Sequence, residues 1–244
     1  MGINEISTIL FDLDGTLLPM DQDLFIEAHL QTYSQKCEQL GLDPNVMIYA
    51  LESGLKAMFN NDGNMTNKQR FWGNFLSVAQ LPGTDSLEEF MQFYLKEFKT
   101  LKSVVFPTPL SKEIIKTAHA KGYQLVLATT PVFPRQATLE RMAWIDLDPA
   151  WFDLITTYED FSYTKPHLGY YRQILAMLDI NPTNCLMVGN DMVEDLVVEE
   201  LGMQTYLVTD WIINPSEKDI APYRKGSLQD LWDYVQKLDS KEGA

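Results

Sequence analysis

Two aspartates, Asp12 and Asp14, stand two residues apart directly after the apolar run Ile9-Leu10-Phe11. The run favours a short buried strand, and Gly15 beyond it allows the chain to turn sharply. Two bare carboxylates at the end of a buried strand are costly unless they are paired or bind a metal. In open α/β sheets, ligands bind at the carboxyl ends of the strands. The pair therefore predicts a site for a divalent cation and for acid–base chemistry.

Polar residues also follow three later apolar runs that the sequence predicts to be strands. Because parallel strands end at one edge of a sheet, we expect these residues to converge with Asp12 on one crevice. Taken singly, each has a plainer interpretation, such as a helix cap for a threonine or aspartate, or a solvated loop lysine. Their occurrence together favours a single site. The residues are Thr129, Thr130, Lys165, Asp191 and, a helical turn later, Asp195.

These side-chain types suit the hydrolysis of a phosphate monoester. Mg²⁺ prefers oxygen ligands, and Asp12, Asp191 and the backbone carbonyl of Asp14 are the predicted ones. We expect Lys165 to bind the phosphate and to hold Asp12 ionised, while the Thr129 hydroxyl donates to phosphoryl oxygens. Asp12 would attack phosphorus to give an aspartyl-phosphate. Asp14 would protonate the leaving oxygen and later deprotonate water.

The same motifs, in the same order, resemble those of the haloacid dehalogenase-like (HAD) hydrolase superfamily. Asp12-Leu13-Asp14-Gly15-Thr16 is similar to its first motif, DxDGT. Thr129 resembles the second-motif Ser/Thr and Lys165 the third-motif lysine. Residues 189–195, Gly-Asn-Asp-Met-Val-Glu-Asp, resemble the acidic fourth motif GDxxxD, with Asn190 inserted.

This resemblance implies a Mg²⁺-dependent phosphatase with a helical cap of the C1 type, acting on a small phosphate ester. Thr130 stands where many relatives carry asparagine, and we assign it to phosphate binding beside Thr129 and Lys165. Asp195 is expected behind the metal ligands Asp12, Asp14 and Asp191. The presence of Asp14 disfavours the haloacid dehalogenases themselves, whose reaction needs neither that acid nor magnesium.

The elements that must position these residues predict an α/β, Rossmann-like fold. From residue 106 onward, strands alternate with helices, which indicates a parallel sheet with helices on both faces. Beyond the strand before Asp12, the predicted strands are 123–129, 152–157, 185–189 and 204–208. The predicted helices are 110–122, 134–144, 168–178, 192–201 and 227–238. Residues 209–226 are expected to be irregular, and we assign them no function.

Residues 21–101 contain no convincing strand and predict four helices joined by short loops, which is typical of a helical bundle. This indicates a helical cap domain, 19–105, inserted after the first strand of a core domain formed by 1–18 and 106–244. Its aromatic and methionine stripes are expected to form the bundle core, with a minority facing Asp12 as a lid. The four helices are 21–40, 44–59, 66–79 and 86–101.

The chain of 244 residues carries a net charge of −15 at pH 7, which argues against nucleic-acid or membrane partners. It does not exclude a phosphate substrate, since a bound dication reverses the local field. Cys37 and Cys185 lie in apolar patterns and are expected to be reduced core residues. With no secretory leader pattern and no apolar run long enough to cross a bilayer, we expect a cytoplasmic protein. The oligomeric state is not predictable.

Other interpretations remain open at this point. A phosphomutase or a phosphonate hydrolase would use the same core, and the latter needs a cap lysine for a Schiff base. The available lysines, Lys36, Lys56 and Lys68, are expected to be solvated. A ligand-binding relative without turnover is disfavoured because binding alone would not require Asp14.

The histidines and two arginines carry less information. His29, His119 and His167 do not cluster by spacing and are expected to be structural or on the surface, with His167 nearest Lys165. Arg135 and Arg141 follow the second predicted strand. They either help to hold an anionic substrate or, more plainly, place charge on a helix surface.

Overall fold

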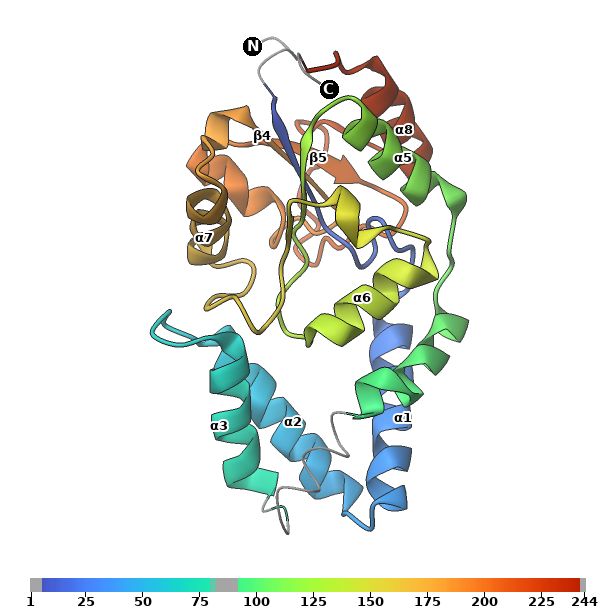
Figure 1. Cartoon of the computed structure of the whole chain (residues 1–244), viewed down its shortest axis with the longest axis vertical. Coiled ribbons are helices and arrows are strands. Elements are labelled where there is room, and N and C mark those ends of the chain that lie inside the picture. The colour runs from blue at the N-terminus through green and yellow to red at the C-terminus, as the bar shows by residue number, and fades with distance from the viewer. Residues whose placement is uncertain (1–5, 80, 82–91, 242–244) are drawn as a thin grey trace.

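The computed structural model describes residues 6–79, 81 and 92–241. Within them, six parallel strands form one sheet in the order β3-β2-β1-β4-β5-β6 (Figure 1). The predicted α/β class with a parallel sheet is therefore confirmed. The strands are β1 (Thr8–Phe11), β2 (Gln124–Leu127), β3 (Leu154–Ile155), β4 (Cys185–Gly189), β5 (Gln204–Val208) and β6 (Lys225–Gly226).

The register of the central strands brings their carboxyl ends level. Phe11, the last residue of β1, stands opposite Leu127 of β2 and Val188 of β4. The residues that follow these strands therefore leave the sheet side by side. This alignment places the turns after β1, β2 and β4 at one edge, where the predicted site residues begin.

Alternation along the strands fills two hydrophobic layers. Ile9 and Phe11 face one layer with α5 (Pro109–Ala120) and α8 (Leu228–Lys237). Leu10 faces the other layer, with α7 (Leu168–Leu178) and the 3₁₀ helix η6 (Leu196–Leu201). Figure 1 shows α7 on one side of the sheet and the α5–α8 pair on the other. Helices cover both faces, as predicted.

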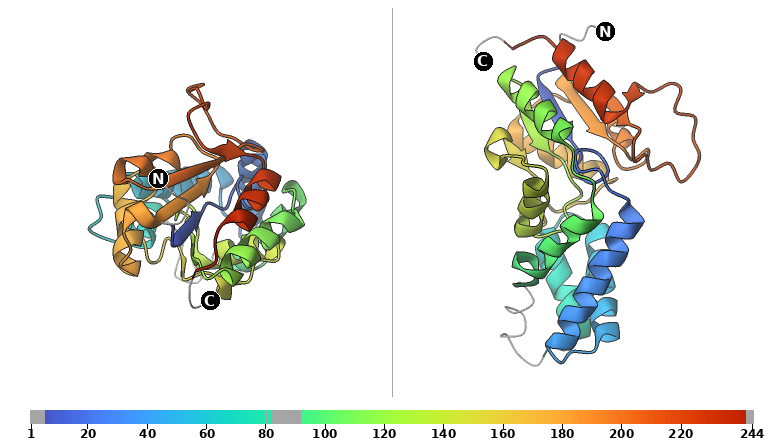
Figure 2. Two further views of the ribbon diagram at one scale, coloured as in Figure 1. Left: turned by 90° about the horizontal axis from the view of Figure 1, so that it is seen from above. Right: turned by 90° about the vertical axis from the view of Figure 1, so that its right-hand side faces the viewer.

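The helical region lies beyond the carboxyl edge of the sheet (Figures 1 and 2). Aspartates begin its first two helices as N-caps: Asp21 accepts from Leu24 N, and Asp43 from Asn45 N. The region contains α1 (Gln22–Gln39), α2 (Pro44–Phe59), α3 (Asn67–Ala79) and the 3₁₀ helices η2 (Phe93–Leu95) and η3 (Glu97–Val104).

Two chain segments join the helical region to the sheet. They pair with each other, through an antiparallel bridge between Met20 and Val105 and a 2.8 Å hydrogen bond from Phe106 N to Pro19 O. Asn67 N, at the start of α3, also donates to Phe161 O at 2.7 Å. The predicted domain limits, 18/19 and 105/106, fall at the paired segments and remain a prediction.

The structure corrects several predicted elements. Much of the predicted helix 86–101 lies outside the described residues, and its described part is helical at Gln92 and continues as the 3₁₀ helices η2 and η3. The predicted helix 192–201 begins as turns and becomes η6 only at Leu196. The segment 209–226 is not wholly irregular, because Lys225 and Gly226 pair in parallel with β5. Strand β6 has two residues, too few to show an alternating pattern.

Two further expectations concern the chain as a whole. Cys37 and Cys185 are buried and free, as predicted. None of the helices in the described ranges is both long and apolar enough to span a membrane.

One more α-helix bears on the site. It is α6 (Arg135–Trp144), which follows the turn after β2. In Figure 1 it lies between the sheet and the helical region. Its buried side chains include Ala137, Arg141 and Met142. One of the predicted surface arginines is thus inside the protein.

Candidate active site

Lys165 is the buried link between two carboxylates. Its Nζ donates to Asp12 Oδ1 and to Asp195 Oδ1, both at 2.7 Å, and the residue is 1% exposed. Burial disfavours the charged ammonium, but Asp12 and Asp195 outweigh it and hold the pKa of Lys165 well above its ordinary value. Burial raises the pKa of Asp195 to about 7, against the lowering effect of Lys165. The predicted contact between Lys165 and Asp12 is present, and Asp195 is a second acceptor for the same ammonium group.

The second oxygen of Asp12 faces Thr16 and Asn190. Thr16 Oγ1 lies 3.1 Å from Asp12 Oδ2 and 2.9 Å from Asn190 Oδ1, so its single proton serves one of them at a time. Asn190 Nδ2 donates to Trp211 O at 2.6 Å, which fixes the amide oxygen toward Thr16. Gly15, at φ +77°, passes so close that a Cβ there would collide with the Asn190 amide. Asn190, which we treated as an insertion, is part of the site.

Asp14 is paired with Arg141. The Arg141 side chain is fully buried, donates from Nη1 to Asp14 Oδ2 and lies over the Phe133 ring at 4.6 Å. Burial raises the pKa of Asp14, and the guanidinium opposes this without cancelling it. Asp14 Oδ1 is buried without a hydrogen-bond partner among the described residues. No hydrogen bond among the described residues therefore competes for a proton on this oxygen.

The surface interpretation of Arg141 was wrong, and that of Arg135 is confirmed. Arg135 is exposed and pairs with Asp160 at 3.2 Å. Arg141 lies six residues further along the chain, among the buried side chains of α6. Spacing along a helix cannot reveal that a guanidinium points inward, because its buried partner Asp14 is distant in sequence.

Asp191 and Glu194 occupy the turn after β4. Asp191 Oδ1 accepts from Val193 N at 2.7 Å and Glu194 N at 2.9 Å, so the plainer interpretation of Asp191 as a cap holds for this oxygen. Thr130 Oγ1 donates to Glu194 Oε2 at 2.7 Å. Burial raises the pKa of Glu194. Our prediction missed Glu194 as a site residue, although it stands beside Asp195 in the quoted motif.

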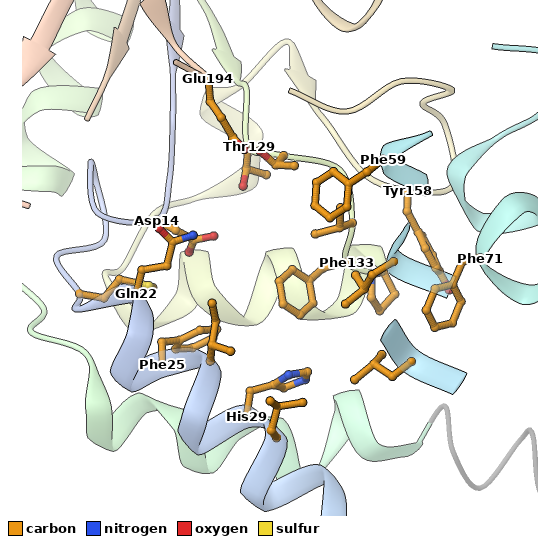
Figure 3. Close-up of a pocket in the computed structure, with 18 of the residues that line it drawn as sticks. Asp14, Gln22, Phe25, His29, Phe59, Phe71, Thr129, Phe133, Tyr158 and Glu194 are labelled. Carbon is orange, nitrogen blue, oxygen red and sulfur yellow. Dashed lines mark hydrogen bonds between the residues drawn. The ribbon is translucent and has the colours of Figure 1, made fainter. Parts of the chain in front are cut away.

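These residues face one cavity of about 400 Å³, and Figure 3 shows Asp14, Thr129 and Glu194 at one end of it. The predicted convergence of distant strand ends on one crevice is therefore present. Lys165 lies behind Asp12 rather than in the wall. The predicted residues in the wall are Asp12, Asp14, Thr129, Thr130, Asp191 and Asp195.

The oxygen atoms at this end fit a magnesium ion. Among the described residues, no three Asp, Glu, His or Cys side chains gather closely enough to hold a metal by themselves. Mg²⁺ does not require that, because it keeps several waters and uses only one or two carboxylates. Asp12 and Asp191 supply hard carboxylate oxygens, and the Asn190 amide oxygen is a further donor of the same kind. The predicted set therefore gains Asn190 as a candidate ligand.

The three lysines considered for a Schiff base do not line this cavity. The expectation that Lys36 is solvated was wrong, because its side chain is largely buried and pairs with Glu97 at 2.8 Å. His119 is exposed, and His167 caps α7 by accepting from Gly169 N at 2.9 Å, so it does not face the crevice. The expected structural or surface roles of these two histidines agree with the structure.

His29 is different, because it lies in the cavity wall on α1 (Figure 3). It is 8% exposed, and the rings of Phe93, Phe98 and Phe133 surround it at 5.6 to 5.8 Å between centroids. Its Nε2 has no hydrogen-bond partner among the described residues. Burial, with a smaller effect from Arg141, lowers the pKa of His29 to about 4.

His29 is therefore expected to make the fold sensitive to acid. The unfolded chain binds its proton below pH 6.5, whereas the folded chain resists it until about pH 4. The stability that the folded protein has with His29 neutral is fully present above pH 6.5. As the pH falls toward 4, the free energy of unfolding decreases by about 3 kcal/mol. Urea unfolding at pH 7 and pH 4.5 should show a smaller loss in His29→Phe than in wild type. His119→Gln is the control, and an equal loss in all three proteins would contradict the assignment.

Comparison with known proteins shows the family to which this chain belongs. A model of haloacid dehalogenase-like hydrolases matches residues 6–197. The pyrophosphatase PpaX of Anoxybacillus flavithermus is 26% identical over 224 residues, which cover 87% of each chain.

Solved structures share the fold. That of a HAD phosphatase from Thermococcus onnurineus aligns with a TM-score of 0.60 and 19% identity, covering 97% of this chain and 100% of that one. The HAD-hydrolase YfnB from Bacillus subtilis, solved with magnesium bound, has a TM-score of 0.52 and 18% identity over 94% and 98% of the two chains.

Proposed function

Because this chain belongs to the haloacid dehalogenase-like hydrolases, we propose that it is a Mg²⁺-dependent phosphatase that forms an aspartyl-phosphate on Asp12. Family membership and the phosphatase names of its relatives support the phosphatase reaction. One observation carries the finer proposal. The carboxylate of Asp12, held by buried Lys165, shares a cavity with a second acid, Asp14, that keeps one oxygen free.

The charges at this end of the cavity require a cation before a phosphate can bind. The carboxylates there are those of Asp12, Asp14, Asp191, Glu194 and Asp195. Two buried cations, Lys165 and Arg141, accompany these five acids, so carboxyl groups outnumber cations even when Asp14 holds the proton that it donates. A phosphate dianion would be repelled by this excess. Bound Mg²⁺ would offset it and would polarise the phosphoryl oxygens.

The residues divide the reaction into two steps. In the first, an oxygen of Asp12 attacks phosphorus, the bond to the leaving oxygen breaks, and Asp14 gives that oxygen a proton. In the second, Asp14 takes a proton from water, the water oxygen bonds to phosphorus, and the bond to Asp12 breaks. Inorganic phosphate leaves, and both acids return to their starting states.

The surroundings of the two acids suit these different tasks. Asp12 accepts from the Lys165 ammonium at 2.7 Å, so a positive charge lies directly beside the proposed nucleophile. Asp14 has a raised pKa, which favours a proton donor. Arg141 holds the other Asp14 oxygen, which fixes the carboxyl group in one orientation and leaves Oδ1 without a hydrogen bond among the described residues. Thr129 lines the same end and is proposed to donate to the phosphoryl group.

Removal of magnesium should abolish most of the activity. Phosphate release from 4-nitrophenyl phosphate would be measured in protein treated with EDTA, and again after excess MgCl₂ is added. We expect a fall of at least about 100-fold, because Lewis-acid stabilisation is worth several kcal/mol. The rate should return with Mg²⁺. A full rate in the presence of chelator would contradict the proposed cofactor.

A further inference from the structure

The cavity extends from the acids far into the helical region, and there its character changes. Figure 3 shows Asp14, Thr129 and Glu194 at one end and Phe25, His29 and Phe71 away from them. Helices α1, α2 and α3, the 3₁₀ helix η2 and the turns after β2 and β3 supply this second part of the wall. Its aromatic side chains include those of Phe25, Phe59, Phe71, Phe75, Tyr94 and Phe133.

Size and wall chemistry indicate what this part can hold. The whole cavity of about 400 Å³ is within the range of sites that enclose small organic ligands. A phosphoryl group at the acidic end leaves space for a ring-sized group beyond it. Aromatic walls bind apolar groups well and also favour edge or stacked contacts with an aromatic ring.

Charge argues against an anionic group in the same place. No lysine or arginine among the described residues lines the cavity. Lys165 is committed to Asp12 and Asp195, and Arg141 to Asp14. A second phosphate or a carboxylate would enter the aromatic part without a partner, which is strongly unfavourable in a desolvated site.

The second part of the wall also holds polar side chains, among them those of Glu52, Tyr94, Tyr158 and His29. His29 is more than nine-tenths buried, lies in the wall, and has an Nε2 with no partner among the described residues. A buried polar atom of this kind is costly unless a ligand or water satisfies it. A substrate that places one hydroxyl or carbonyl group beside His29 would supply the missing hydrogen bond.

We propose that the aromatic part of the cavity binds the leaving group of the substrate, and that this group is uncharged, carries a ring, and has one hydroxyl or carbonyl group that meets His29. The inference rests on the proposed function, since it names the substrate class of that site. It implies that pyrophosphate and sugar bisphosphates are poor substrates of this protein.

Matched primary alkyl phosphates test the preference, because their leaving groups have similar intrinsic reactivity. Values of kcat/KM would be measured for 2-phenylethyl phosphate and 2-hydroxyethyl phosphate, with pyrophosphate as the charged comparison. We expect the phenyl compound to be favoured over both by about 100-fold, because even one methylene group in an apolar pocket changes kcat/KM by 10-fold or more. Equal rates, or a preference for pyrophosphate, would overturn the proposal.

Two substitutions locate the effect. Leu55→Trp fills the cavity and should lower kcat/KM for the phenyl compound at least about tenfold while sparing 2-hydroxyethyl phosphate. Leu76→Trp, at a residue that does not line the cavity, is the matched control. His29→Leu should remove a preference, about tenfold in wild type, for hydroxyphenylethyl over phenylethyl phosphates. Unchanged ratios in Leu55→Trp or in His29→Leu would contradict the assigned wall or the assigned hydrogen bond.

Binding without turnover separates this inference from the proposed function. Titration calorimetry with two inert compounds, 3-phenylpropylphosphonate and 3-phosphonopropanoate, should show about tenfold tighter binding of the phenyl compound. If no ester is hydrolysed but this difference is found, the phosphatase proposal fails and the cavity assignment stands. If esters are hydrolysed and the charged phosphonate binds as tightly, the cavity assignment alone fails.

Discussion

Replacement of Asp12 by asparagine is expected to lower phosphate release by at least about 10⁴-fold, the scale seen when an enzyme loses its nucleophile. The amide has nearly the shape of the carboxylate, so Thr16 and Lys165 keep a partner at this position. It cannot displace a leaving group from phosphorus. The rate would be measured with 4-nitrophenyl phosphate and Mg²⁺, and acid-quenched wild type should carry one phosphoryl group by intact mass.

The control for this substitution is Asp43→Asn. Asp43 caps α2 by accepting from Asn45 N at 2.9 Å, and asparagine caps a helix as well as aspartate does. This variant should keep the wild-type rate. If Asp12→Asn also turned over normally, or if a phosphoryl group were found on a different residue, Asp12 would not be the nucleophile.

The sequence was sufficient for the convergence of Asp12, Lys165 and Asp191 on one edge of the sheet. Apolar runs that alternate with helices determine a parallel sheet, and a parallel sheet brings its strand ends to one edge. This inference needs only the order of elements along the chain. It does not depend on the direction of any individual side chain.

The sequence was not sufficient to predict the direction of individual side chains or the partners that they contact. Arg141 has the same type as exposed Arg135, and only the folded chain shows that it reaches Asp14. Asn190 looked like an extra residue when the motif was matched by letter, whereas its amide oxygen faces Thr16 beside Asp12. The empty hydrogen-bond position on His29 is likewise a property of the packed wall and not of spacing.

Replacement of Lys165 by methionine is expected to destabilise the fold by about 3–5 kcal/mol at pH 8, because it leaves Asp12 and Asp195 as unpaired buried charges. The loss should be smaller at pH 5. Burial already raises the pKa of Asp195 to about 7, and removal of the ammonium that lowers it raises it further. As the pH falls, the folded protein binds a proton on Asp195 before the unfolded chain does. The free energy of unfolding therefore recovers as the pH falls toward the ordinary pKa of an aspartate.

Urea unfolding of wild type, Lys165→Met and the exposed control Lys116→Met at both pH values would measure these differences. The control should stay within about 0.5 kcal/mol of wild type, as is usual for surface substitutions. The double variant Lys165→Met/Asp195→Asn should regain part of the loss, because it removes one of the two unpaired charges. A Lys165→Met protein as stable as wild type at pH 8, or one that gains nothing from the second substitution, would mean that Lys165 does not balance the buried carboxylates of Asp12 and Asp195.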